Sequence, residues 1–379
     1  MNTNITAARG ALASWFTGGG GFVLGVFVAS RLLILGIIVL SKTIIVRGNF
    51  WHDGGVMSVL TQWDGAWYLS IARNGYEFST ERQSNMGFFP FYPMLVKLVS
   101  YVFHDVAQAG VITSNLCLLA AGLLLYRLVS IDYPDRKVPR SAVLFLMFSP
   151  VSFFFSSAYT ESTFIMLVIA AFFAARKGQW LVAGLLGMMV SATRQVGLLL
   201  VLPLFVEYVR QSYERGFNLR VLLHPRILLL GLVPLGLFLF MLYGQLRFSD
   251  FFAFFHATAV WGRHLSSPLS NLAHYERYGY FYRWLFLGTL GAAAALCAAG
   301  LFLRVRASYL VFTAVMILIY ISSNSLEAIP RNLSVLFPLF IVMGIISSRF
   351  EWTYEPMLAT STGLLTLCTI LAANGFWMT

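Results

Sequence analysis

Long apolar runs, separated by short polar segments, recur along the whole chain. An α-helix needs about 20 apolar residues to cross the hydrocarbon of a membrane, and several of the runs approach that length. The pattern predicts eleven candidate spans, at 22–41, 108–127, 141–156, 158–175, 180–193, 196–209, 227–244, 284–303, 307–321, 333–348 and 357–375. The predicted fold class is therefore an all-α polytopic membrane protein, whose single transmembrane domain covers residues 1–379.

Two of the apolar stretches are interrupted at membrane depth. Ser149-Pro150 and Ser156-Ser157 break the stretch 141–175, and Thr193-Arg194-Gln195 breaks the stretch 180–209. Non-helical backbone inside a membrane survives only where protein or a water-filled cavity satisfies its polar groups. We therefore expect a cavity near one face of the protein.

The short loops set the orientation, because Lys and Arg are retained on the cytoplasmic side. With eleven alternating spans, one side collects the basic residues Arg9, Arg127, Arg136, Lys137, Arg140, Arg176, Lys177, Arg210, Arg215, Arg220, Arg226, Arg304, Arg306 and Arg349. This arrangement puts the N-terminus in the cytoplasm. It also predicts two long outer loops, 42–107 and 245–283, on the opposite face.

Composition agrees with this class of protein. Hydrophobic residues make up 59% of the 379 residues and charged residues only 11%, whereas soluble domains average about 25% charged residues. The net charge of +11 would suit nucleic acid, but the basic residues form no aromatic-interleaved patch, so no nucleic-acid partner is expected. The three cysteines lie in apolar stretches, which excludes a disulfide scaffold.

The first outer loop holds the densest polar and aromatic motif, residues 61–76. Trp63, Trp67 and Ile71 recur at helical spacing, which predicts an interfacial amphipathic helix that Asn74-Gly75 ends. Two interpretations of Asp64 stay open. Thr61-x-x-Asp64 fits a capping box, and a carboxylate at the membrane boundary could also take a proton from a hydroxyl.

Other polar residues at the expected outer face have a structural and a functional interpretation. Glu161 opens a span, where the helix dipole favours an acid. Arg194 lacks a neighbouring counter-ion and could snorkel or bind a lipid phosphate, and Arg31 within the first span is equally open. Arg331 follows Pro330 at the mouth of a span as an anchor or a phosphate ligand.

The second outer loop carries a small cationic group. His256, Arg263 and His264 lie there without the closely spaced further ligands that a metal site needs. Arg and His donors suffice for a phosphate group. We expect no cofactor, although a divalent ion bound by Asp64 stays an alternative.

Several of these motifs together resemble the PIG-V-type (GPI mannosyltransferase-like) family of GT-C polytopic membrane glycosyltransferases. The resemblance rests on Trp63-Asp64-Gly65-x-Trp67-Tyr68, Ile71-Ala72-x-x-Gly75-Tyr76, Phe89-Pro90-x-Tyr92-Pro93, Ser157-Ala158-Tyr159-x-Glu161-Ser162, Arg194-x-x-Gly197, Trp261-Gly262-Arg263, and Pro330-Arg331 followed by Phe337-Pro338. It covers about residues 25 to 345. Asn332 departs from the family pattern, which places an aromatic residue after that arginine.

The resemblance implies transfer of a sugar, typically mannose, from a polyprenyl-phosphate donor to a lipid-linked or glycolipid acceptor. It implies an acid in the first outer loop as general base, and Asp64 is the match. One carboxylate suffices for an inverting displacement, whereas a retaining one needs a second, nucleophilic carboxylate.

The remaining candidates follow as substrate-binding residues. Arg331, Arg263, His256 and His264 would hold the donor phosphate, and Arg194 and Glu161 would shape the acceptor side. Trp63, Trp67 and Tyr68 complete the predicted set. The enzyme would be embedded in membrane lipid, in a bacterial plasma membrane or the ER membrane, with its active site on the non-cytoplasmic face.

Two other functions fit parts of the pattern. A lipid or solute transporter or flippase would explain the broken spans, but its densest polar motif should lie mid-membrane. A non-catalytic subunit with the same fold would have no need for Asp64 within a full Trp-Asp motif.

Overall fold

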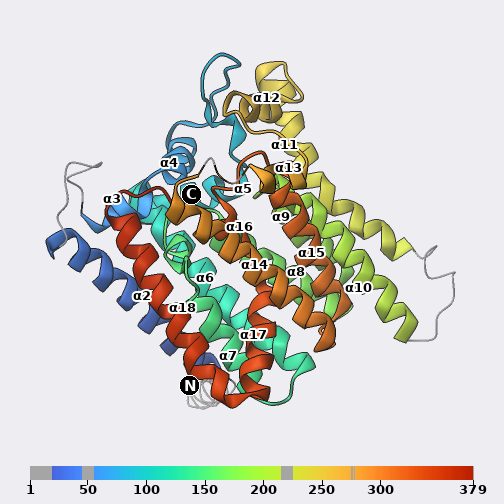
Figure 1. Ribbon diagram of the computed structural model, residues 1–379. Helices are drawn as coiled ribbons and strands as arrows, with labels where there is room; N and C mark the ends of the chain where they lie inside the picture. Colours follow the sequence, from blue (N-terminus) through green and yellow to red (C-terminus); the bar gives the residue numbers. More distant parts are fainter. Residues whose placement is uncertain (1–18, 45–54, 215–224, 275, 277, 379) are drawn as a thin grey trace, which may run out of the picture.

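The structure, a computed structural model, describes residues 19–44, 55–214, 225–274, 276 and 278–378. The predicted topology residues Arg9, Arg215 and Arg220, and positions 45–54 of the first outer loop, lie outside this part. The described chain is helical and forms no β-strand, only one isolated bridge between Leu265 and Ser323. Most of the long helices run from the lower to the upper end of a bundle (Figure 1).

The helices follow one another along the chain with short connections. The α-helices are α2 (Gly20–Ile44), α3 (Val56–Thr61), α4 (Asp64–Asn74), α5 (Phe91–Phe103), α6 (Val106–Asp132), α7 (Lys137–Met147), α8 (Glu161–Arg176), α9 (Trp180–Ser191), α10 (Val201–Glu214), α11 (Leu232–Phe248), α12 (Ala253–Val260), α13 (Pro268–Ala273), α14 (Tyr280–Phe302), α15 (Ala307–Ile321), α16 (Ile329–Leu333), α17 (Phe337–Arg349) and α18 (Tyr354–Ala373). The 3-10 helices are η1 (Asn85–Gly87), η2 (Ser152–Phe155), η3 (Gln195–Leu200), η5 (Pro225–Gly231) and η7 (Glu351–Thr353).

Six of the described helices are long and apolar enough to cross a membrane. They are Gly20–Ile44, Val106–Asp132, Gln195–Glu214, Pro225–Phe248, Tyr280–Phe302 and Glu351–Ala373, and shorter apolar helices accompany them. The all-α polytopic fold is thus confirmed. The count of eleven spans stays a prediction, because α9, α15 and α17 are too short to qualify by length.

The predicted break in the stretch 141–175 is real and is filled by protein. α7 ends at Met147, η2 follows, and α8 begins only at Glu161. Arg31 of α2 reaches into the gap, where its guanidinium donates to the carbonyl oxygens of Met147 and Ser152 at 2.9 and 3.0 Å. It also donates to the hydroxyls of Ser152 and Ser156. The buried arginine therefore has a structural role, since it supplies the donors that the broken backbone needs inside the bundle.

The core is built where the helices cross. Aromatic residues of α7, α8, α15 and α17 fill it, and Phe145, Phe172, Phe312 and Phe337 are each almost fully buried. Burial of side chains this large is a leading source of apolar packing energy. The resulting rigid bundle carries the upper segments on its top.

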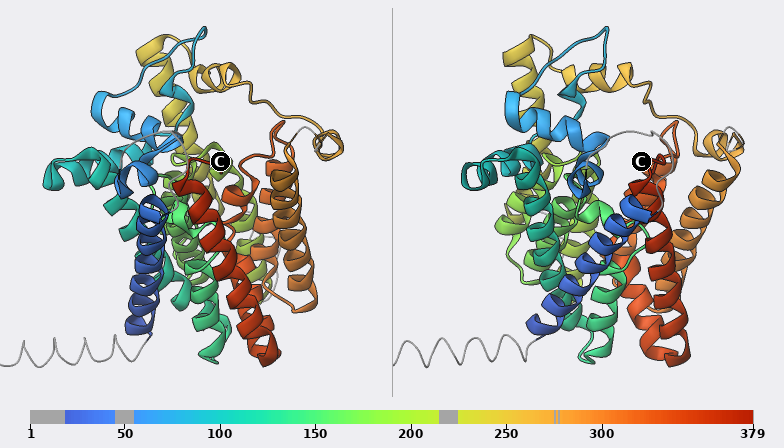
Figure 2. Two further views of the ribbon diagram at one scale, coloured as in Figure 1. Left: turned by 60° about the vertical axis from the view of Figure 1, so that its left-hand side comes forward. Right: turned by 90° about the vertical axis from the view of Figure 1, so that its left-hand side faces the viewer.

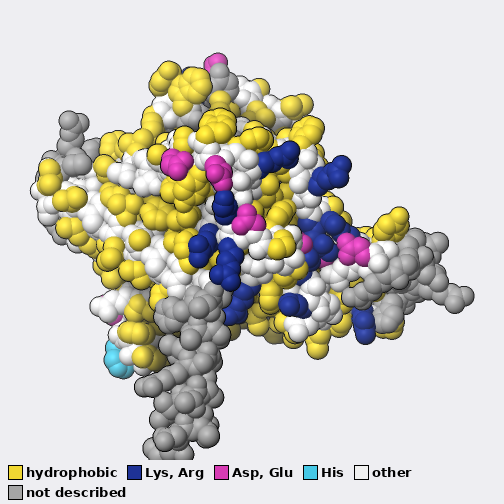
Figure 3. Space-filling model, turned by 90° about the horizontal axis from the view of Figure 1, so that it is seen from below, with side chains coloured by type: hydrophobic (Ala, Val, Ile, Leu, Met, Phe, Trp, Pro, Cys, Tyr) yellow, Lys and Arg dark blue, Asp and Glu magenta, His cyan; other side chains and the backbone are white. Residues whose placement is uncertain are grey.

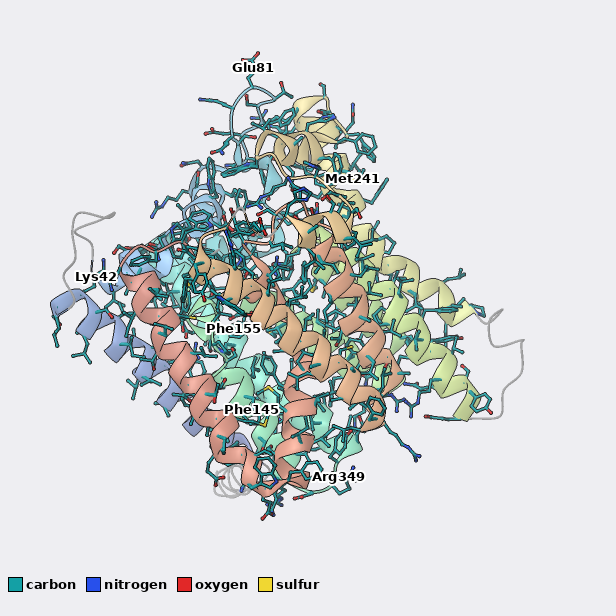
Figure 4. The ribbon with its side chains drawn as sticks, in the orientation of Figure 1. Lys42, Glu81, Phe145, Phe155, Met241 and Arg349 are labelled. Carbon is teal, nitrogen blue, oxygen red and sulfur yellow. The ribbon has the colours of Figure 1, made fainter. Side chains whose placement is uncertain are left out.

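The two predicted outer loops contain short helices at the upper end. The first, 42–107, holds α3, α4 and α5, and the second, 245–283, holds α12 and α13. In the left view of Figure 2, α5 extends sideways from the bundle, and its Met94, Leu98 and Tyr101 are exposed. Figure 4 shows Glu81 of the first loop at the upper end and Arg349 at the lower end.

Candidate active site

The predicted base and a predicted phosphate ligand contact each other, although 267 residues separate them. Asp64 is the first residue of α4, and Arg331 lies in α16. Nη1 of Arg331 donates to Oδ2 of Asp64 at 2.6 Å. The Asp64 side chain keeps 26% of its surface exposed and Arg331 12%. The pair is therefore largely enclosed, but its carboxylate remains within reach of a ligand.

A second acid extends this pair into a cluster. Oε1 of Glu161 lies 3.3 Å from Nε of Arg331 and also accepts a hydrogen bond from Nη2 of Arg194. Nε of Arg194 donates to Oγ1 of Thr160 at 2.9 Å. Glu161 has no exposed surface at all. We call Asp64, Glu161, Arg194 and Arg331 the upper cluster, in which two acids and two arginines alternate.

The backbone that presents Asp64 is held in a strained shape. Trp63 has φ of 55° and ψ of −125°, a region that costs a bulky residue about 1–3 kcal/mol. Tyr159 donates from its hydroxyl to the carbonyl oxygen of Gln62 at 2.9 Å, and the ring of Trp63 packs on Trp377 with centroids 5.8 Å apart. Contacts from two distant segments thus hold the turn that aims Asp64.

Gly65 is required because two segments approach closely here. A Cβ at this position would meet Cε2 of Tyr159 at 3.3 Å and the carbonyl oxygen of Ala158 at 3.4 Å. The absence of a side chain lets α4 pack directly on the segment that precedes Glu161. This explains why glycine follows Asp64 in the motif.

Aromatic rings form one wall of the cluster. The guanidinium of Arg331 lies 5.3 Å from the ring centroid of Tyr159 and 5.7 Å from that of Phe154, within the range of cation–π attraction. On the other side, the ring of Phe164 lies 5.6 Å from the guanidinium of Arg194. The two arginines are therefore held by cation–π contacts with aromatic rings as well as by ion pairs with carboxylates.

Several buried polar atoms of this region have no hydrogen-bond partner. They are Oε2 of Glu161, Nη1 of Arg194, Nε of Arg331 and the hydroxyl of Tyr320. A buried polar group without a partner costs about 1–3 kcal/mol, so their concentration in one place needs an explanation. A bound ligand that supplies the missing partners would account for it.

Two aromatic residues of the predicted set, Trp67 and Tyr68, pack against neighbouring rings from α4, the helix that Asp64 begins. Tyr68 packs edge-on against Tyr92 and Phe88, at 5.4 and 5.1 Å, and burial raises its pKa to about 12. It therefore stays a neutral phenol. Trp67 stacks on Phe88 at 5.9 Å and meets Trp261 edge-on at 5.3 Å. The Trp-Asp motif thus builds an aromatic layer beside Asp64.

The predicted residues of the second outer loop do not join the cluster. His256 is paired with Asp250 at 2.6 Å, and Arg263 lies 3.3 Å from Glu327. The backbone nitrogen of His264 donates to Asn324, and its side chain is exposed. Within the described part of the chain, none of the three forms an ion pair or hydrogen bond with the upper cluster, and their role toward a phosphate stays a prediction.

The capping-box interpretation of Asp64 is wrong. Thr61 is the last residue of α3, and its hydroxyl donates to the carbonyl oxygen of Met57 at 2.8 Å. The residue before α4 is Trp63, which provides no side-chain cap. Asp64 does occupy the first turn of a helix, where the dipole favours a carboxylate, but its hydrogen-bond partner is Arg331.

The donor set fits a divalent cation poorly. Asp64 and Glu161 are each engaged by arginine, and two guanidinium groups within the cluster repel a further cation. Among the described residues, no group of three or more His, Cys, Asp or Glu side chains gathers at one point. The cluster is better suited to an anion or to a neutral polar ligand.

The sequence patterns did not single out several residues that contact the cluster or the turn before it, among them Thr160, Tyr159, Tyr320 and Trp377. Thr160 and Tyr159 lie inside the motif around Glu161, so their neighbourhood in sequence was the available signal. Tyr320 and Trp377 come from α15 and from the segment after α18, and the chain offers no local signal for them. Only the three-dimensional packing brings these residues to the cluster.

Comparisons with known proteins agree on one family and one fold. The family model described as Mannosyltransferase (PIG-V) matches residues 48–254. GPI mannosyltransferase pigv-1 of Caenorhabditis elegans is 30% identical over 128 residues, which covers 30% of this chain and 18% of the relative. GPI alpha-1,6-mannosyltransferase 2 of Rattus norvegicus is 28% identical over 190 residues, or 46% and 36% of the two chains. The match thus spans well under half the length of these relatives.

Solved structures give the same fold. ArnT from Cupriavidus metallidurans, bound to undecaprenyl phosphate, is similar with a TM-score of 0.55 and 12% identity, over 93% of this chain and 76% of that one. The oligosaccharyltransferase of Archaeoglobus fulgidus, tethered with an acceptor peptide, gives a TM-score of 0.50 at 12% identity, over 96% and 56%. At such identity the likeness concerns the GT-C fold alone.

Proposed function

The chain belongs to the Mannosyltransferase (PIG-V) family, and on that premise we propose that it moves mannose from a polyprenyl-phosphate carrier to a hydroxyl group of a lipid-linked or glycolipid acceptor. The named relatives are GPI mannosyltransferases. The fold is shared with a protein whose structure contains undecaprenyl phosphate, which supports a polyprenyl-phosphate donor. The chain itself is an integral multi-pass membrane protein, so both lipid substrates reach it from the bilayer.

Asp64 acts as the general base. Its carboxylate takes the proton of the acceptor hydroxyl while that oxygen bonds to the anomeric carbon of the donor. The bond between this carbon and the phosphate oxygen breaks, and its electron pair stays on the polyprenyl phosphate. The single observation that carries the proposal is the 2.6 Å contact between Asp64 and Arg331.

Arg331 links the base to the leaving group. Its guanidinium fixes the position of the Asp64 carboxylate through the 2.6 Å contact, and further N–H groups remain for phosphate oxygens. Charge accumulates on the phosphate as the glycosidic bond breaks. A positioned cation at that point stabilises the transition state more than the ground state.

The second carboxylate is a poor nucleophile, which favours inversion. A retaining displacement would need Glu161 to attack the anomeric carbon. Glu161 is fully buried, and its Oε1 lies between two guanidinium groups. A carboxylate neutralised in this way is less nucleophilic, so a single displacement assisted by Asp64 fits the geometry better.

The distribution of basic residues supports a site on the non-cytoplasmic face. Seen from below, Lys and Arg side chains gather on the lower face of the molecule (Figure 3). Loops rich in Lys and Arg stay in the cytoplasm, and the upper cluster lies at the other end of the bundle. The site would then open to the outside of a bacterial cell or to the ER lumen.

Replacement of Asp64 by Asn tests the proposal directly. Purified Asp64→Asn protein should lose about 10²- to 10⁴-fold in transfer rate, the range that general bases contribute. The measurement is acceptor-dependent release of polyprenyl phosphate from polyprenyl-phosphate-mannose. Asp135→Asn, at an exposed site before α7, is the matched control and should keep full activity. Full transfer by Asp64→Asn would remove Asp64 as the base.

A further inference from the structure

Two of the unpartnered polar atoms of the upper cluster belong to Glu161 and Arg194, the acid and the arginine that do not contact Asp64. Oε2 of Glu161 and Nη1 of Arg194 lack partners, although each residue is engaged through its other atoms. The hydroxyl of Tyr320 makes no hydrogen bond of regular geometry; it lies beside the Arg194 guanidinium, close enough for a weak hydrogen bond to it, and near Glu161. These atoms come from three separate elements, the start of α8, the turn before η3 and the end of α15.

The chemistry of the three atoms identifies the ligand class. Oε2 of Glu161 only accepts hydrogen bonds, Nη1 of Arg194 only donates them, and the phenol of Tyr320 does either. A phosphate oxygen would satisfy Arg194 but would lie beside an anionic carboxylate oxygen. A metal ion would satisfy Glu161 but would be repelled by Arg194 and Arg331.

Hydroxyl groups satisfy all three atoms at once. A hydroxyl donates its hydrogen to Oε2 of Glu161 while its lone pairs accept from Nη1 of Arg194 or from Tyr320. Hexoses carry such hydroxyls on neighbouring carbons, with a spacing that one carboxylate and one guanidinium can span. The pair Glu161 and Arg194 therefore matches a sugar ring better than any charged group.

We propose that Glu161, Arg194 and Tyr320 form a subsite for the ring hydroxyls of a sugar substrate, next to the phosphate position at Arg331. This inference rests on the proposed function and assigns the sugar-recognition part of the same site. Arg331 touches both Asp64 and Glu161, so it joins the subsite to the reacting centre. Recognition of the sugar and position of the base are thereby coupled through one side chain.

Binding to the purified full-length chain, without turnover, tests the subsite. Three probes are compared: polyprenyl phosphate, polyprenyl-phosphate-mannose, and octyl α-mannoside added with saturating polyprenyl phosphate. In Glu161→Gln we expect a loss of about 10- to 100-fold in affinity for a mannose-bearing probe, the size of hydrogen bonds to a charged group. Affinity for polyprenyl phosphate alone should change less than about threefold. Glu355→Gln, an exposed acid of α18, is the matched control.

The arms of this experiment have different meanings. Loss confined to polyprenyl-phosphate-mannose assigns the subsite to the donor sugar, and loss confined to octyl α-mannoside assigns it to the acceptor. An equal loss for polyprenyl phosphate alone would overturn the proposal, because Glu161 would then only hold Arg331. An unchanged affinity for both mannose probes would overturn it too, and the atoms would be matched by water.

Tyr320→Phe gives a second variant that removes only the phenol hydroxyl, which makes no hydrogen bond of regular geometry in the structure and has Arg194 as its nearby polar neighbour. It should fold like the wild type and lose about three- to tenfold in affinity for the same mannose probe. Because these readouts need no transfer, they are independent of whether Asp64 is the base. A transferase that keeps its activity in Asp64→Asn would refute the mechanism and leave the subsite to be judged by binding.

Discussion

Each end of the bundle carries a cluster of two acids and two arginines, and the two clusters differ in how completely their buried polar atoms are hydrogen-bonded. The lower cluster consists of Asp132, Arg176, Glu207 and Arg306, again two acids and two arginines. Glu161 and Arg176 begin and end the same helix, α8, and a rise of 1.5 Å per residue puts them about 22 Å apart. In each cluster one acid is fully buried, and the other keeps about a quarter of its surface exposed.

The lower cluster is saturated with hydrogen bonds. Glu207 accepts from Nε and Nη2 of Arg306, from the hydroxyl of Ser308 and from the amide of Gln211, each at 2.7 Å. Arg176 donates to both carboxylate oxygens of Asp132 at 2.6 and 2.7 Å. None of these four charged residues contributes a buried side-chain atom without a partner.

The upper cluster has the same charges and lacks that saturation. Three of its buried nitrogen and oxygen atoms make no hydrogen bond. Charge balance is therefore not what separates the two ends. A saturated network has nothing left to offer a ligand and serves the fold, whereas an unsaturated one holds hydrogen-bonding capacity that a substrate can use.

Glu207→Gln should produce the largest effect on stability. The amide removes the negative charge from a fully buried position and deprives Arg306 of its nearest counter-ion, which leaves only Glu214 at 4.0 Å. Breaking a buried pair in this way costs about 3–5 kcal/mol in the free energy of unfolding. Denaturant unfolding of the purified protein in detergent measures it, and transfer per folded molecule should stay at the wild-type level. A stable Glu207→Gln protein without transfer would make the lower cluster part of the active site.

Arg331→Ala should show the opposite pattern, with the main loss in binding. Removal of the guanidinium deprives the donor phosphate of a charged partner, which typically costs about 2–4 kcal/mol, or about 30- to 1000-fold in affinity. Polyprenyl phosphate binding measures the loss, and Arg349→Ala at the lower end of α17 is the control. The free energy of unfolding should fall less than in Glu207→Gln. Unchanged affinity for polyprenyl phosphate would remove Arg331 from the phosphate site.

Much of the fold follows from local pattern. Apolar length predicted α2, α6 and α14, and Ser149-Pro150 predicted the interruption before α8, because these signals lie within one segment. The residue that binds the free carbonyl groups of this interruption could not be predicted from the local pattern. Arg31 lies more than a hundred residues away from the carbonyls that it binds, and no periodicity links the two.

The site was predictable as a set of residues but not as an arrangement. Motifs singled out Asp64, Glu161, Arg194 and Arg331 one by one, and the structure brings these four together. The sequence assigned Arg331 to phosphate and Asp64 to the base, without the contact between them. In the sequence, His256 and Arg263 were candidates for the phosphate in the same way as Arg331. In the structure they are paired with Asp250 and Glu327, outside the upper cluster. Which cation meets which acid depends on the packing of several helices.

Gly65→Ala tests whether the upper cluster depends on close packing. The added Cβ meets Tyr159 and Ala158 at 3.3–3.4 Å, and Tyr159 is held by its bond to Gln62. α4 must therefore shift by a few tenths of an ångström, which costs about 1 kcal/mol of stability and should lower the transfer rate about tenfold. Gly36→Ala in α2, where the Cβ meets nothing within 4 Å, is the control. Wild-type transfer by Gly65→Ala would show that the position of Asp64 tolerates such a shift.

Trp377→Ala should have the smallest effect on the transfer rate. It tests whether the contact with Trp377 maintains the strained turn at Trp63. Trp63 keeps its positive φ only because its surroundings hold it, and Trp377 supplies one edge-on ring contact at 5.8 Å. Such a pair is worth about 0.5–1.5 kcal/mol, so we expect a loss of about two- to tenfold in transfer rate and little change in polyprenyl phosphate affinity. Trp352→Ala, at an exposed position of the lower end, removes the same ring without touching the turn and should leave transfer unchanged. If both variants behave alike, the contacts of Tyr159 and Phe154 suffice to hold the turn. If only Trp377→Ala loses transfer, the segment after α18 helps to hold Asp64 in place.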